Sequence, residues 1–125
     1  MNKNKIKEKT EQAIMKQLYE RGYATCVDSL VIIGWLQPKS ILEWRNGRIP
    51  YLERVCCTNL SHLNTFLRCY MQFAKDNEYS LRWTCYQRKK KKVKLYFTRN
   101  HEENIERCYA MHIVCMSMKG QNPKI

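Results

Sequence analysis

The chain lacks the sequence patterns that mark most catalytic, exported and membrane-spanning proteins. It contains no Gly-rich phosphate loop, no Gly-x-Ser-x-Gly and no His-Glu-x-x-His, and its acidic residues are scattered singly or paired as Glu102-Glu103. Its longest nearly uncharged apolar run, residues 29–36, is far shorter than the roughly 20 residues that cross a bilayer. After the basic start, Glu8 and Glu11 stand where a signal peptide needs an apolar stretch. We therefore expect a cytoplasmic protein that is not an enzyme and has no membrane span.

Paired cysteine motifs are also missing. The seven cysteines are an odd number and include no Cys-x-x-Cys pair, which is typical of reduced, buried thiols rather than of a disulfide framework. Cys108, His112 and Cys115 are spaced at i, i+4 and i+7, so a helix would align three zinc ligands that need a fourth. The same spacing suits the core-facing stripe of a helix. We expect no metal and no cofactor, and the zinc alternative stays open for these three residues.

Acidic residues are absent from residues 80–100, where eight of the chain's 23 basic residues gather. The eight are Arg82, Arg88, Lys89, Lys90, Lys91, Lys92, Lys94 and Arg99. Elsewhere the basic residues and the 11 acidic residues nearly balance, so most of the net charge of +12 is local. A local excess of cations indicates a partner with a dense row of negative charge, and we expect that partner to be nucleic acid.

Helical spacing and capping residues predict helices in the first part of the chain. Helices are expected over residues 6–21, which Gly22 ends, and over residues 29–33, between caps at Thr25 or Asp28 and a stop at Gly34. Another is expected over residues 38–47. A long helical region follows over residues 50–75, with residues 58–61 as a candidate break.

Alternating apolar residues predict a two-stranded antiparallel β-hairpin over residues 81–98, with its lysines in a mobile loop. The residues expected on its inner face are Leu81, Trp83, Cys85, Val93, Leu95 and Phe97. A last helix is expected over residues 100–118. The expected fold is thus α+β, a mainly helical single domain with one two-stranded antiparallel hairpin. Residues 1–5 are expected to form a basic arm and residues 119–125 a flexible tail.

The two short helices around Gly34, followed later by the basic hairpin, resemble a winged helix-turn-helix DNA-binding domain. The resemblance covers residues 25–47 and 81–98 and identifies no specific family. It implies a small DNA-binding regulator in which the hairpin acts as the wing. The sequence departs from the pattern at Ser40 and Glu43, where such families place apolar residues, so neither receives a base-reading role.

The expected nucleic-acid-binding residues lie on the outer face and tip of the hairpin and near Gly47. They are Arg82, Tyr86, Arg88, Lys89, Lys90, Lys91, Lys92, Lys94, Tyr96, Arg45 and Arg48. The cations would contact phosphates of DNA or RNA, and the two tyrosines would stack on unpaired bases. The alternative is a protein-interaction module without catalytic activity that binds an acidic protein partner or dimerises. Lysines that only keep a strand edge soluble are a third explanation.

Overall fold

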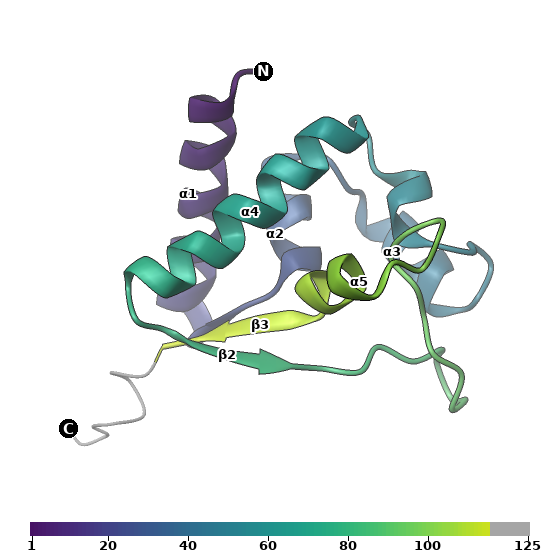
Figure 1. Cartoon of the computed structure of the whole chain (residues 1–125). Coiled ribbons are helices and arrows are strands. Elements are labelled where there is room, and N and C mark those ends of the chain that lie inside the picture. Colours follow the sequence, from purple (N-terminus) through teal and green to yellow (C-terminus); the bar gives the residue numbers. More distant parts are fainter. Residues whose placement is uncertain (116–125) are drawn as a thin grey trace.

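Capping side chains and glycines set the bounds of the first three helices in the computed structural model, which describes residues 1–115 (Figure 1). Helix α1 (Lys3–Arg21) begins where the Asn2 side chain accepts a hydrogen bond from the Lys5 amide, and it ends at Gly22 with φ 81°. Helix α2 (Cys26–Ile33) lies between the Thr25 cap and Gly34, and α3 (Pro38–Arg45) begins at a proline. Because Asn2 caps α1, Lys3 and Lys5 belong to this helix rather than to a free arm.

The helical region expected over residues 50–75 breaks just before Leu60, within the candidate break at residues 58–61. A short 3-10 helix, η1 (Leu52–Val55), precedes α4 (Leu60–Asp76), whose first turn is capped by the Asn59 side chain at 2.8 Å from the His62 amide. Helix α4 buries one apolar stripe and packs across α1 (Figure 1).

The expected two-stranded hairpin over residues 81–98 is wrong, because the sheet pairs different segments. Three strands, β1 (Tyr23–Ala24), β2 (Ser80–Trp83) and β3 (Met111–Val114), form an antiparallel sheet in the order β1-β3-β2. Strand β2 pairs with β3, with Trp83 opposite Met111, and not with residues 93–98. The structure is therefore α+β and mostly helical, with a small three-stranded antiparallel sheet.

Residues 93–98 find hydrogen-bond partners outside the sheet. Their only ladder contact with the preceding segment is an isolated bridge between Gln87 and Lys94. Beyond it, the Leu52 amide donates to the Tyr96 carbonyl at 3.1 Å, and the Glu53 amide donates to the Phe97 carbonyl at 2.9 Å. Because η1 satisfies these carbonyls, the segment docks on η1 instead of extending β2.

The expected last helix is too long. Helix α5 (Glu103–Tyr109) ends at Ala110, and the next residues form the central strand β3. Ile113 and Val114 are β-branched, and a central strand is hydrogen bonded along both edges, so the extended form is favoured there. Residues 116–118 of the expected helix and the expected tail at 119–125 lie outside the described residues.

The core lies between the sheet and the helices α1, α4 and α5, which cover one of its faces (Figure 1). Tyr70 of α4 is fully buried at its centre, and its hydroxyl lies 3.0 Å from the Ala24 carbonyl and 2.9 Å from the Met111 carbonyl. This contact ties α4 to both β1 and β3. Within residues 1–115, no helix is both long and apolar enough to cross a membrane.

Candidate functional site

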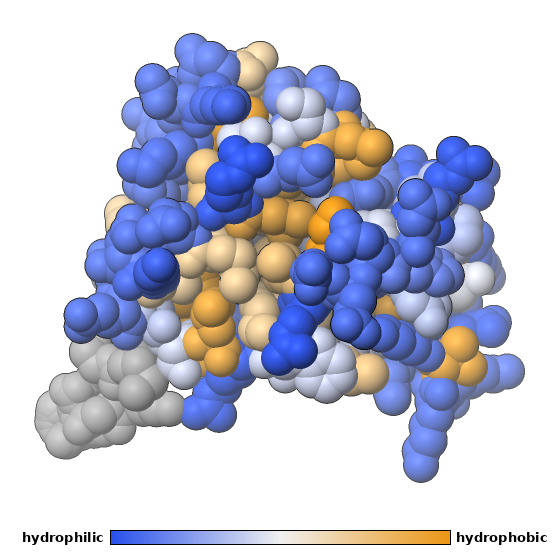
Figure 2. Space-filling view, in the orientation of Figure 1, coloured by the Kyte–Doolittle hydropathy of each residue, from blue (hydrophilic) through white to orange (hydrophobic). Residues whose placement is uncertain are grey.

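Four consecutive lysines project from the body of the protein on a loop that is anchored at the end of α3. We call Arg88, Lys89, Lys90, Lys91 and Lys92 the basic loop. The Lys89 amide donates to the Arg45 carbonyl at 2.8 Å, and the Arg88 Nε donates to the Asn46 carbonyl at 3.2 Å. Figure 2 shows the loop as the polar projection at the lower right. Carbonyls at a helix end carry partial negative charge, so they stabilise cations held there.

Gly47 makes room for this anchor. Its φ of 78° lies in the left-handed region, and a Cβ at this position would stand 2.8 Å from Arg88 Cδ and collide with the Arg88 guanidinium. The positive φ therefore favours glycine at this position, and any larger residue would also displace the Arg88 side chain. The turn after α3 and the basic loop form one local unit.

The cations of this unit form no ion pair with a carboxylate of residues 1–115. Arg45 and the basic loop line one surface hollow of about 570 Å³, together with Cys85 and Gln87. The ion pairs within residues 1–115 all lie on α1 and α2, for example Lys16 with Glu20 and Arg21 with Asp28. Of the site cations predicted from sequence, none in this described part of the chain pairs with a carboxylate. The positive field at the hollow is therefore available to an outside partner.

The predicted outward orientation of Tyr86 is wrong. Its ring packs 5.7 Å from Trp44 and 5.3 Å from Phe97 between centroids, and its hydroxyl lies 2.8 Å from His112 Nε2. Burial raises the pKa of Tyr86 above its usual range. The alternation that placed it outside fails because the chain leaves β2 after Trp83. Tyr86 is therefore packed beneath the site, where its ring contacts the Arg45 guanidinium at 5.6 Å from the ring centroid.

The other predicted residues fall into two groups. Lys94 and Tyr96 line a groove beside the basic loop, where the Tyr96 ring stacks on His101 at 3.6 Å and lies 5.4 Å from Lys94 Nζ. Arg82, on β2, and Arg48, after α3, are exposed but line neither the groove nor the hollow. Nine of the 11 predicted residues thus lie in or beneath two adjoining surface depressions.

Sequence reasoning missed Trp83, which it assigned to a covered face. Trp83 is 53% exposed and forms part of the same groove, while Trp44 and Trp35 are buried. Its position follows from β2 lying at the edge of the sheet, because an edge strand has less of its face covered. Strand order is set by pairing between distant segments, so no local pattern in the sequence could have identified this exposure.

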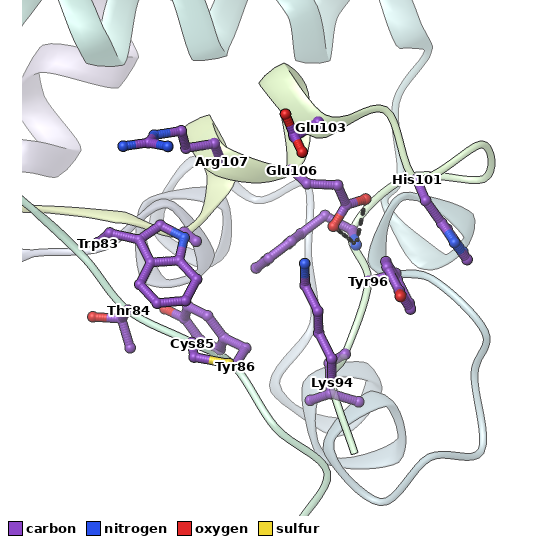
Figure 3. Close-up of a pocket in the computed structure, with 13 residues that line it drawn as sticks. Trp83, Thr84, Cys85, Tyr86, Lys94, Tyr96, His101, Glu103, Glu106 and Arg107 are labelled. Atoms are coloured by element: carbon purple, nitrogen blue, oxygen red, sulfur yellow. Dashed lines mark hydrogen bonds between the residues drawn. The ribbon is translucent and has the colours of Figure 1, made fainter. Parts of the chain in front are cut away.

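A buried carboxylate positions the segment that carries Lys94 and Tyr96. Glu106 of α5 is 6% exposed and accepts hydrogen bonds from the Phe97 amide, the Thr98 amide and the Thr98 hydroxyl, at 2.7–3.0 Å. Figure 3 shows its carboxylate turned down toward this segment. Nearby, the Tyr109 hydroxyl donates to Glu53 at 2.6 Å, and burial raises the pKa of Glu53. These two acids are structural ligands of the backbone and of a core tyrosine.

The single helical stripe that the zinc alternative requires is not formed. Cys108 lies on α5, whereas His112 lies on β3, where Nδ1 is 3.2 Å from the Thr84 hydroxyl and Nε2 contacts Tyr86. Burial, and then the nearby Arg21 guanidinium, lower the pKa of His112, so its ring is held neutral between two hydroxyls. Within residues 1–115, no three His, Cys, Asp or Glu side chains are grouped closely enough to hold a metal ion.

Comparisons of the chain with protein-family models, with curated proteins and with solved structures find no match.

Proposed function

We propose that this protein binds nucleic acid, chiefly through phosphates, at the hollow formed by Arg45 and the basic loop. The observation that carries the proposal is the gathering of six cations at one depression without a carboxylate partner in the described part of the chain. Like charges so placed repel one another and add nothing to folding stability. A row of phosphates offsets that repulsion and releases counterions on binding.

The anchoring of the loop supports the same proposal. Arg88 is held by the Asn46 carbonyl and Lys89 by the Arg45 carbonyl, so the base of the loop is fixed while its lysine side chains stay exposed. A fixed base limits the conformational freedom that is lost when phosphates bind. The proposed role is binding without catalysis. The exposed Cys57 and Cys85 thiols fit a reducing, cytoplasmic setting.

A charge-matched pair of variants tests the proposal. One variant changes Lys89, Lys90, Lys91 and Lys92 to Gln, and its control changes Lys3, Lys5, Lys7 and Lys9 of α1 to Gln. Both remove four positive charges, so a difference between them reports position rather than net charge. Retention on a random-sequence oligonucleotide is measured against salt concentration, with heparin as an acidic polymer for comparison.

We expect the loop variant to lose oligonucleotide affinity and to flatten the dependence of log K on log salt. Each lost phosphate contact lowers that slope by roughly 0.7–0.9, so four contacts would change it by about 3. The α1 variant should behave like the parent. Equal losses in both variants would contradict the proposal. Tight binding of the parent to heparin with no binding to the oligonucleotide would instead favour an acidic protein partner.

A further inference from the structure

The backbone of Trp83 is fixed by the sheet, yet about half of the residue is exposed to solvent. It ends β2 opposite Met111, and the next residue is fixed because the Thr84 amide donates to the Ala110 carbonyl at 3.0 Å. The backbone position is thus determined by the sheet, while 53% of the residue stays exposed. Indole is the largest apolar side chain, and leaving it exposed on an ordered strand is unfavourable in water. An aromatic surface presented in this way is suited to a planar ligand.

The indole forms one wall of a groove of about 380 Å³, which we call the Trp83 groove. The opposite wall is the stacked pair Tyr96 and His101, and the Lys94 side chain rises between the walls (Figure 3). Glu103 and Arg107 of α5 line its upper side. A groove of this size, with aromatic walls and a few polar groups, is within the range of small-ligand sites.

The Trp83 groove adjoins the hollow of the basic loop, because Cys85 lines both. Trp83 and Arg88 are five positions apart in the sequence, and a fully extended chain of that length spans no more than about 18 Å. A single ligand of a few nucleotides can therefore reach from the indole to the lysines. Phosphates would lie over the cations while one base enters the groove.

We propose that the Trp83 groove receives an unpaired base, so that the preferred ligand is single-stranded nucleic acid. This inference rests on the proposed function and adds the form of the strand. A base inside a duplex has both faces covered by its neighbours, whereas an unpaired base can stack on an aromatic ring. Among the groups that line the groove, the Glu103 carboxylate can accept hydrogen bonds from base amino groups, and the Lys94 and Arg107 side chains can donate to base oxygens and ring nitrogens. The groove thus offers a stacking surface and hydrogen-bonding groups for a base, while the basic loop offers cations for phosphates.

The test measures binding of Trp83→Ala to three labelled ligands: a single strand, an abasic strand of the same length and a duplex of the same sequence. Loss of the stacking between one base and the indole should weaken single-strand binding by about 5- to 150-fold. Affinity for the abasic strand and the duplex should stay that of the parent. Trp83→Phe, which keeps an aromatic ring, should retain most of the single-strand affinity.

Tyr19→Ala is the matched control, because Tyr19 is 92% exposed on α1, far along the chain from the groove. It should bind all three ligands like the parent, and thermal unfolding confirms that every variant is folded. Unchanged single-strand binding by Trp83→Ala, or equal losses on all three ligands, would overturn the inference while leaving phosphate binding intact. If the parent binds none of the three ligands, the proposed function itself fails.

Discussion

Removing the Glu106 carboxylate should cost a large share of the protein's stability. Its two oxygens accept from three donors that are otherwise cut off from water: the Phe97 amide, the Thr98 amide and the Thr98 hydroxyl. Glu106→Ala leaves all three without an acceptor and opens a cavity. Each unsatisfied buried donor costs about 1–3 kcal/mol, and the relief of a buried charge offsets part of the sum.

The net loss expected for Glu106→Ala is about 3–5 kcal/mol, a large share of a typical stability of about 5–15 kcal/mol. Glu106→Gln should cost less, about 1–2 kcal/mol, because the oxygen that receives most of these hydrogen bonds, Oε2, can be replaced by the amide oxygen. In Glu106→Gln the Phe97 amide keeps the oxygen at the Oε2 position as an acceptor but meets an amino group at the Oε1 position. The ordering of the two variants separates hydrogen-bond geometry from charge.

Urea unfolding monitored by circular dichroism measures these losses. With an m-value of about 2 kcal/mol/M, Glu106→Ala should lower the midpoint by about 2 M. Glu103→Gln is the control, since Glu103 is exposed on the same helix and should change stability by less than about 0.5 kcal/mol. Equal midpoints for Glu106→Ala and Glu103→Gln would refute the assignment of Glu106 as the ligand of this segment.

Two further predictions concern the loop anchor and the histidine. Gly47→Ala should lose about 1–2 kcal/mol through left-handed strain and also weaken oligonucleotide binding by displacing Arg88. Gly34→Ala, whose added Cβ meets nothing within 4 Å, should lose stability alone; equal effects of both on binding would contradict the coupling. Because the pKa of His112 is below its ordinary 6.5, the unfolded chain binds more protons as the pH falls through that value. The urea midpoint should therefore drop between about pH 7 and pH 5, and a drop of the same size in His112→Gln would show that another group is responsible.

Local signals predicted the ends of α1 and α2 and the break before α4, since their causes lie within a few residues of each helix end, but they extended the last helix past Tyr109 into β3. Thr25, Gly22 and Gly34 act as caps through their own side chains or backbone freedom, and the Asn59 cap explains the break before α4. The sheet could not be predicted in this way. Pairing of β2 with β3 joins segments about thirty residues apart, and such pairing depends on the whole fold rather than on nearby residues.

At the candidate site, too, the features set by neighbouring residues could be predicted, and those set by distant residues could not. The clustering of cations in sequence correctly placed Lys89 to Lys92 together, because neighbours in the chain stay neighbours in the loop. The contribution of Arg45 depends on a hydrogen bond from Lys89 to its carbonyl, 44 residues away along the chain. The outward assignment of Tyr86 followed from extending one alternation past the end of β2, where the strand geometry that justifies it has ended. Trp83 lies within β2, and its inward assignment failed because β2 is an edge strand of the sheet.

The position of β3 has a consequence for biosynthesis. This central strand is the last element described, so a ribosome has already made all the helices of residues 1–110 before the residues that join β1 to β2 emerge. Until then Tyr70 lacks the Met111 carbonyl, and the core lacks Ile113, which is fully buried in the folded protein. Completion of the core is thus delayed until this region has been translated, and a nascent chain halted before residue 111 would leave exposed the apolar side chains that β3 covers.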